Sequence, residues 1–207
     1  MLFIGARLGR ADDGPTLSAD TGWQRVSEKD GVTLFSRSRV GSSIKEFKGT
    51  GVISAAPGAV EKVLQDVGDY PTFMPYVTEV RVISRDDGNF LVYQRLNVPF
   101  VSDRDYTLRV EHGITNGPGG VIIYRDTWQT ADEAGPPPRR GTVRVRNNEG
   151  SWLLEPVGGT STQATYQIYT DSGGVIPAFL VNRGSQIVIP RLFDAIRKQV
   201  QDPKYRP

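Results

Sequence analysis

Alternating apolar and polar residues occupy most of the chain after Trp23, a pattern typical of half-buried β-strands. Several of these runs are joined by tight-turn sequences such as Asp30-Gly31 and Asp87-Gly88, and Asp-Gly between alternating runs is a strong β-hairpin signal. We therefore predict a meandering antiparallel sheet of roughly seven to nine strands. Its last three strands are expected at Thr142–Asn147, Ser151–Pro156 and Thr160–Thr170, with a turn at Asn148–Gly150.

Two segments show the three- and four-residue apolar spacing of amphipathic helices instead. The first is predicted to run from about Pro57 to Val67, with glycine following it. The second is predicted from about Pro177 to Val200, and it carries one apolar stripe before Pro190 and another after it. Because a proline inside a helix usually kinks it, we expect this last helix to be long and bent.

This order of elements predicts an α+β fold. We expect a flexible segment at residues 1–20 and a single domain over residues 21–203. A curved antiparallel sheet that wraps around a helix leaves an interior wide enough for a small ligand. The last helix would then close an apolar cavity; the alternative is that it packs on the sheet and covers an ordinary core.

Composition narrows the chemistry that the chain can perform. The 207 residues include no cysteine and a single histidine, His112, which excludes thiol catalysis, disulfides and multi-histidine metal sites. The formal net charge of +2 offers no electrostatic basis for nucleic-acid binding. The sequence has neither a phosphate-loop spacing nor a calcium-loop spacing. We expect no cofactor, no metal ion and no nucleic-acid partner.

The N-terminal residues leave the compartment open. Met1–Arg7 is apolar but too short for the core of a signal peptide, which needs roughly 7–15 residues. It is either a frayed end or the remainder of a removed or truncated signal. The protein is accordingly cytoplasmic or, in the second case, periplasmic or secreted. No stretch approaches the about 20 apolar residues of a membrane span.

The segment Pro99–Tyr106 carries the most distinctive candidate chemistry, because it places an arginine between two aspartates at the start of a strand. Residues two apart in a strand share a face, so one face combines Arg104, Tyr106, Leu108, Val110 and His112. This mostly apolar face is expected to point inward, with Arg104 at the rim of the interior. A buried arginine needs an anionic partner. Arg104 either anchors the polar head of a ligand or pairs with an acidic residue such as Asp126.

Other predicted elements supply further candidates for ligand contact. In addition to the five residues on the Arg104 face, they are Phe73, Met74, Tyr93, Tyr124, Asp126, Trp128, Tyr166, Phe179, Leu180 and Ile187. Acid–base catalysis would need Arg104, His112, Asp126 or a tyrosine, but a lone histidine near a strand end is more typical of a structural residue. We assign no catalytic residue.

Four stretches, in the order in which they occur, resemble the StAR-related lipid transfer (START) family of the helix-grip superfamily. They are Trp23 with Asp30–Val32, the first helix with Asp69–Phe73, Pro99–Tyr106, and Asp171–Pro177 leading into Leu180–Asn182. The resemblance spans about Trp23 to Val200. The second stretch is also similar to the polyketide-cyclase and coenzyme-Q-binding branch of that superfamily.

The resemblance implies a curved antiparallel sheet around a long C-terminal helix, with a tunnel that holds one lipid or sterol. It implies a monomeric carrier, not an enzyme, which moves a hydrophobic ligand between membranes through transient surface contact. Many relatives have a basic residue six positions after the arginine, where this chain has Val110. That departure favours sterols, fatty acids or other largely neutral ligands over phospholipids. A polyketide aromatase/cyclase and a ligand sensor are the alternatives.

Overall fold

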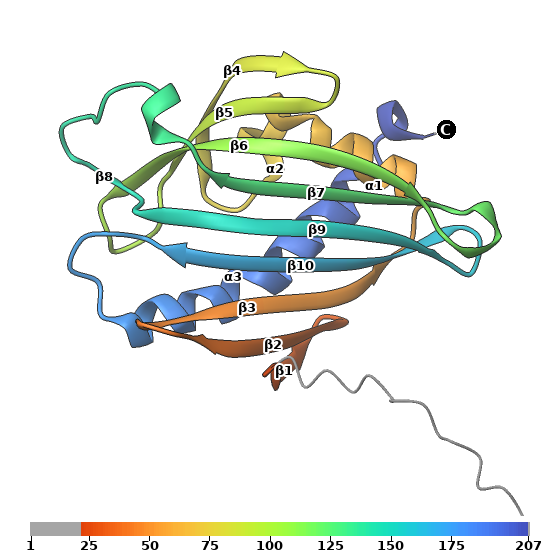
Figure 1. The fold of residues 1–207 in the computed structure, drawn as a ribbon, viewed down its shortest axis with the longest axis horizontal. Coiled ribbons are helices and arrows are strands. Elements are labelled where there is room, and N and C mark those ends of the chain that lie inside the picture. Colours follow the sequence, from red (N-terminus) through yellow and green to blue (C-terminus); the bar gives the residue numbers. More distant parts are fainter. Residues whose placement is uncertain (1–21, 207) are drawn as a thin grey trace, which may run out of the picture.

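A computed structural model describes residues 22–206, in which ten strands form one sheet (Figure 1). The strand order is β1-β2-β3-β10-β9-β7-β6-β5-β4, with all neighbours antiparallel, and β8 pairs with β6 in parallel. The strands are β1 Gln24–Lys29, β2 Val32–Arg39, β3 Ser42–Ile53, β4 Val77–Asp86, β5 Asn89–Leu96, β6 Asp103–Asn116, β7 Ile122–Thr130, β8 Thr142–Arg144, β9 Asn147–Val157 and β10 Ser161–Asp171.

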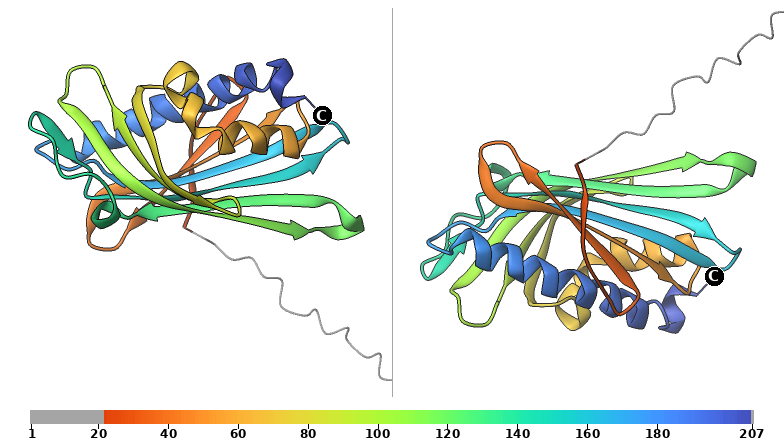
Figure 2. Two further views of the ribbon diagram at one scale, coloured as in Figure 1. Left: turned by 90° about the horizontal axis from the view of Figure 1, so that it is seen from above. Right: turned by 90° about the horizontal axis from the view of Figure 1, so that it is seen from below.

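The α-helices lie together on one face of the curved sheet (Figure 2). They are α1 Pro57–Gln65, α2 Tyr70–Phe73 and α3 Ala178–Gln199. Short 3-10 turns occur at Val67–Asp69, Pro118–Gly120, Asp132–Ala134 and Pro203–Tyr205. The predicted helix-grip α+β fold is confirmed, and the long final helix lies within two residues of its expected bounds.

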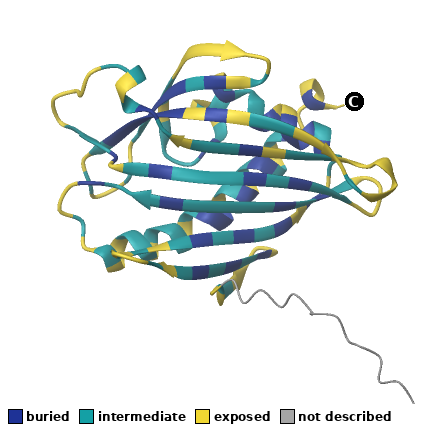
Figure 3. Cartoon of the chain, viewed as in Figure 1, coloured by how far each residue is buried: buried dark blue, intermediate teal, exposed yellow. Residues whose placement is uncertain are grey.

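The two halves of α3 differ in burial (Figure 3). Residues 178–188 include no buried position, whereas Ile189, Phe193 and Ile196 are almost completely buried. The second half packs closely on β3: a Cβ at Gly49 would lie 2.7 Å from a methyl group of Ile189. Glycine at this position therefore lets the helix approach the sheet, and the helix continues through Pro190.

The turn predicted at Asn148–Gly150 is wrong. These residues lie inside β9, which runs unbroken and pairs with β10 along its whole length. The ring of Trp128 lies over Gly150 and leaves no room for a side chain. A Cβ at this position would lie 2.4 Å from a ring carbon of Trp128 and 2.3 Å from the carbonyl oxygen of Gln167. The glycine thus marks a close contact, not a change of chain direction.

The flexible segment predicted at residues 1–20 lies outside the described residues, and the single domain over residues 21–203 stays a prediction. Among residues 22–206, no helix combines the length and the apolar content needed to cross a membrane.

Candidate functional site

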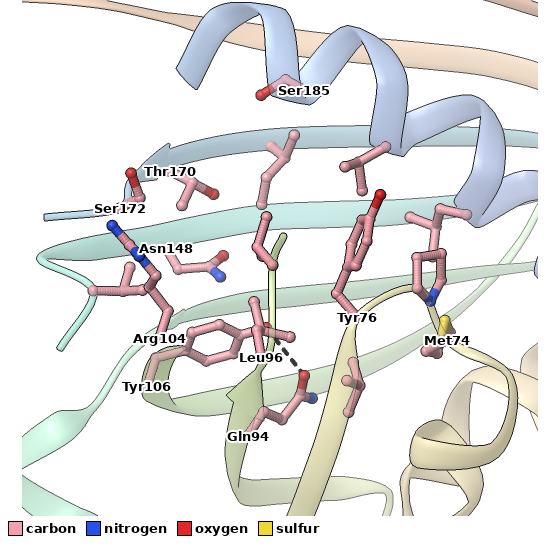
Figure 4. A pocket seen from close by; sticks show the side chains of 18 of the residues that line it. Met74, Tyr76, Gln94, Leu96, Arg104, Tyr106, Asn148, Thr170, Ser172 and Ser185 are labelled. Carbon is pink, nitrogen blue, oxygen red and sulfur yellow. Dashed lines mark hydrogen bonds between the residues drawn. The ribbon is translucent and has the colours of Figure 1, made fainter. Parts of the chain in front are cut away.

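A cavity of about 710 Å³ lies between the concave face of the sheet and the first half of α3. This volume is within the range of small-molecule sites, about 300–1,000 Å³. The walls come from α3 and from β5, β6, β7, β9 and β10, and the segments after α2 and after β5 complete them. Figure 4 shows polar groups gathered around Arg104, while Met74 and Tyr76 lie further along the cavity.

Most of the residues predicted to contact a ligand lie in this wall. Those that do are Met74, Arg104, Tyr106, Leu108, Val110, Asp126, Trp128, Tyr166, Leu180 and Ile187. As predicted, every second residue of β6 from Arg104 to Val110 faces the cavity. Their role in ligand binding stays a prediction.

Five of the predicted contacts do not line the cavity. Tyr93 is fully buried on the opposite face of β5, where its hydroxyl donates to Asp105 Oδ2 at 3.1 Å. The reason is strand alternation, because its neighbours Val92 and Gln94 face the cavity. Phe179 points away from the cavity and is 69% exposed.

The other three residues pack outside the cavity wall. The Phe73 ring meets the Tyr70 ring edge-on at 5.6 Å. The Tyr124 ring stacks on the His112 ring at 6.1 Å. His112 itself lies behind the wall, beside Glu61 and Asp126.

Arg104 is an almost fully buried cation. The residue is 6% exposed, and its guanidinium forms no salt bridge within residues 22–206. One nitrogen donates to the carbonyl oxygen of Ser102, and Nε has no hydrogen-bond partner among the described residues. Burial lowers the pKa of Arg104, and the nearby Asp103 opposes this effect. The predicted alternative, an Arg104–Asp126 pair, is wrong because Asp126 bonds to His112.

Polar side chains missed by the sequence analysis lie beside Arg104. Asn148, Thr170 and Ser172 line the same part of the cavity (Figure 4). Asn148 Oδ1 accepts a hydrogen bond from Trp128 Nε1 at 3.0 Å. Thr170 shares a strand face with the predicted Tyr166, so extending that alternation would have found it. Asn148 was hidden by the wrongly predicted turn.

A second polar group lies further along β6. Glu61 of α1, His112 of β6 and Asp126 of β7 converge, with His112 Nδ1 3.0 Å from Glu61 Oε1 and 2.8 Å from Asp126 Oδ1. Burial and, after it, the charge of Asp126 raise the pKa of Glu61 to about 7. Burial also raises the pKa of Asp126, against the opposing His112 hydrogen bond. The sequence analysis missed Glu61 entirely.

Two loops at the same end of the sheet form part of the cavity wall (Figure 1). Residues 97–102 connect β5 and β6, and residues 172–177 precede α3; both loops contribute to the wall. Their apolar side chains Phe100 and Val175 are fully exposed. Phe100 has φ +69°, a left-handed conformation that is unusual for a bulky residue.

Comparison with known proteins agrees with this architecture. A family model described as "Polyketide cyclase / dehydrase and lipid transport" matches residues 53–197. An uncharacterized protein of Pseudomonas aeruginosa is 29% identical over 161 residues, 77% of each chain. The phosphatidylcholine transfer protein of Rattus norvegicus is 25% identical over 182 residues, 87% of this chain and 84% of that protein.

Solved structures are similar over most of the chain. A STAR-related lipid transfer protein from Xanthomonas axonopodis has a TM-score of 0.75 at 26% identity and covers 87% of this chain and 99% of its own. Human StAR-related lipid transfer protein 5 has a TM-score of 0.77 at 21% identity, over 89% and 88% of the two chains, which shows the common fold. The chain therefore belongs to the polyketide cyclase / dehydrase and lipid transport family and has the START helix-grip fold.

Proposed function

We propose that this protein binds, in its cavity, one lipid whose head group carries a phosphate or a carboxylate, and that it transfers this lipid between membranes. The observation that carries the proposal is Arg104, a buried guanidinium without a salt bridge in the described chain, at the polar end of an otherwise mainly apolar cavity. Burying a charge without a partner costs free energy. A phosphate or carboxylate beside Arg104 would remove that cost.

The two ends of such a ligand have different roles. Its apolar part supplies affinity, at roughly 25 cal/mol per Å² of surface removed from water. Its head group sets the orientation, since Arg104 can bind a phosphate or carboxylate bidentately and Asn148 and Ser172 lie close by. This argument favours phospholipids and fatty acids over neutral sterols, in contrast to the inference from Val110. The similarity to phosphatidylcholine transfer proteins agrees with it.

Membrane contact is assigned to the mouth of the cavity. We place this mouth beside Phe100, which lines the cavity, and Val175, because both side chains are fully exposed. Side chains of this kind can insert into the interface of a bilayer, and the opening would then face the lipid. The first half of α3, which has no buried residue, would act as the lid.

Lipid binding by Arg104 variants tests the proposal. The delipidated protein is incubated with vesicles that contain phosphatidylcholine, fatty acid and sterol, and is then analysed by native mass spectrometry. We expect one phospholipid or fatty acid per chain. Arg104→Met should bind the same lipid about tenfold or more weakly, because a charge-assisted contact contributes about 1.5–3 kcal/mol.

Two controls make the result interpretable. Arg109→Met removes an exposed β6 arginine that does not line the cavity and should leave binding unchanged. Without ligand, Arg104→Met should raise the free energy of unfolding by about 0.5–2 kcal/mol, as expected when a functional residue is replaced by a packing one. Binding of sterol alone, or equal phospholipid and fatty acid binding by Arg104→Met, would contradict the proposed role of Arg104.

An aromatase/cyclase activity is the second candidate. It rests on Asp126, which lines the cavity and accepts a hydrogen bond from His112, an arrangement suitable for acid–base catalysis. Asp126→Asn and His112→Gln should abolish turnover of a polyketide-like substrate if this candidate holds. Unchanged turnover in both variants would exclude these residues as the catalytic groups.

A further inference from the structure

Three side chains that can bind a metal ion meet away from the mouth of the cavity. Glu61, His112 and Asp126 come from three different elements, α1, β6 and β7. One potential ligand atom from each lies within 4.8 Å of the other two. The side chains are 8%, 15% and 5% exposed, respectively. The tertiary structure thus converts separate sequence positions into a compact group of one imidazole and two carboxylates.

The protein's own hydrogen bonds leave this group incomplete. Glu61 Oε1 accepts from Gln65 Nε2 at 2.9 Å, but the buried Oε2 has no partner among the described residues. His112 Nδ1 carries at most one proton, yet it faces an oxygen of each carboxylate. A buried oxygen without a donor costs about 1–3 kcal/mol, and more when it is charged.

A bound cation would satisfy all these atoms at once. Divalent zinc takes imidazole nitrogen at about 2.0–2.1 Å and carboxylate oxygen at about 2.0–2.2 Å. Ligand atoms about 3 Å apart are compatible with such bonds after small side-chain shifts. Calcium and magnesium prefer oxygen ligands alone, whereas imidazole suits zinc and its transition-metal neighbours.

We propose that Glu61, His112 and Asp126 form a binding site for a divalent transition-metal ion. Three protein ligands leave a fourth tetrahedral position for water or for another small ligand. Because Asp126 also lines the cavity, the ion lies next to it. The ion would join α1 to the β6–β7 hairpin and stabilise that end of the cavity wall.

Zinc binding to the full-length protein tests this site. The protein is treated with a chelator, dialysed and titrated with Zn²⁺ in an isothermal titration calorimeter. The zinc bound per chain is measured by inductively coupled plasma mass spectrometry. We expect one Zn²⁺ per chain. At a zinc concentration about 100 times the Kd, the midpoint of thermal unfolding should rise by about 5–10 °C. Cobalt substitution should give a visible absorption spectrum typical of mixed nitrogen and oxygen ligands.

Isosteric variants separate this site from surface binding. Glu61→Gln and His112→Gln should lose the stoichiometric zinc and the thermal shift. Glu111→Gln is the matched control, because Glu111 precedes His112 on β6 but is exposed, and it should bind zinc like the parent. Circular dichroism in chelator checks that each variant is folded. If the folded parent binds no stoichiometric zinc, or if folded Glu61→Gln binds it as tightly, the site does not exist.

Discussion

Arg104 and Glu61 are each 6% exposed, and each has a buried polar atom without a partner among the described residues, Nε and Oε2 respectively. Buried polar atoms are normally hydrogen-bonded, so exceptions need an explanation. The two residues carry acid and base groups of opposite charge type, and only Arg104 lines the cavity, whereas Glu61 lies behind its wall. We propose that bound ligands would satisfy both atoms: a phosphate or carboxylate head group at Arg104 and a cation at Glu61.

Gly150 provides a test of packing at the same scale. Gly150→Ala should lower the free energy of unfolding by about 1–3 kcal/mol, the usual cost of overpacking, because the new Cβ would overlap Gln167 O and the Trp128 ring. Urea denaturation measures the change. Gly68→Ala is the control, since a Cβ there meets no atom within 4 Å and the backbone φ is not positive. Equal stability of Gly150→Ala and the parent would show that the β9 backbone adapts without cost.

At the scale of elements, the two halves of α3 are held by different contacts. The first half is tied to the start of β3 by Asn182, whose Oδ1 accepts from Lys45 N at 2.9 Å and whose Nδ2 donates to Ser43 O at 3.2 Å. The second half is fixed by Arg197, which donates to the carbonyl oxygens of Asp30, Gly31 and Val52. This division predicts that only the first half moves during ligand exchange.

Variants of these two residues should separate mobility from stability. Asn182→Ala should speed the dissociation of a bound fluorescent lipid by about 2- to 10-fold, because each hydrogen bond contributes about 0.5–1.5 kcal/mol. Arg197→Ala should instead lower the free energy of unfolding by about 1–2 kcal/mol with a smaller effect on exchange. Stopped-flow fluorescence and urea denaturation measure the two quantities. If the dissociation rate of the lipid is unchanged in Asn182→Ala, the moving part is not α3, and the loop at residues 97–102 becomes the candidate.

The loop before α3 is a poor place to test hinge motion. Gly173 and Gly174 have φ of +66° and +70°, whereas proline requires a φ near −65°. Substituting proline at either position would therefore destabilise the folded protein as well as alter any motion. The Asn182 and Arg197 variants avoid this ambiguity.

At the scale of the whole molecule, the exposed apolar residues at the cavity mouth lie at one end of the sheet, and the β6–β7 turn lies at the other (Figure 1). Phe100→Ser with Val175→Ser should slow lipid transfer between vesicles by about tenfold or more, since burying a phenylalanine contributes about 1.5–3 kcal/mol. Lipid capacity in the absence of vesicles should stay unchanged. Ile114→Ser removes a side chain that is 58% exposed near the far end and serves as the control; equal slowing by this variant would exclude the mouth as the docking surface.

Local sequence patterns determined a large part of this architecture. The two-residue period of β6 correctly placed every second side chain from Arg104 to Val110 on one face. The spacing of apolar residues typical of a helix located α3. Both patterns depend on contacts within a few residues, so they can be read without knowing the fold. The order of hairpins and helices, together with the resemblance to START proteins, was sufficient to predict the helix-grip fold.

Tertiary contacts decided the features that the sequence analysis missed. Tyr93 lies on the opposite face of β5 because Gln94 pairs with the cavity-facing Tyr106. Gly150 lies within a strand, where it makes room for the ring of Trp128, a residue far from it in the sequence. Glu61 lies far from His112 and Asp126 along the chain, and no periodic pattern connects the three. The pairing of β6 with β7 sets His112 opposite Asp126, and only the packing of α1 against the sheet brings Glu61 to them, because that contact depends on where the elements lie in space.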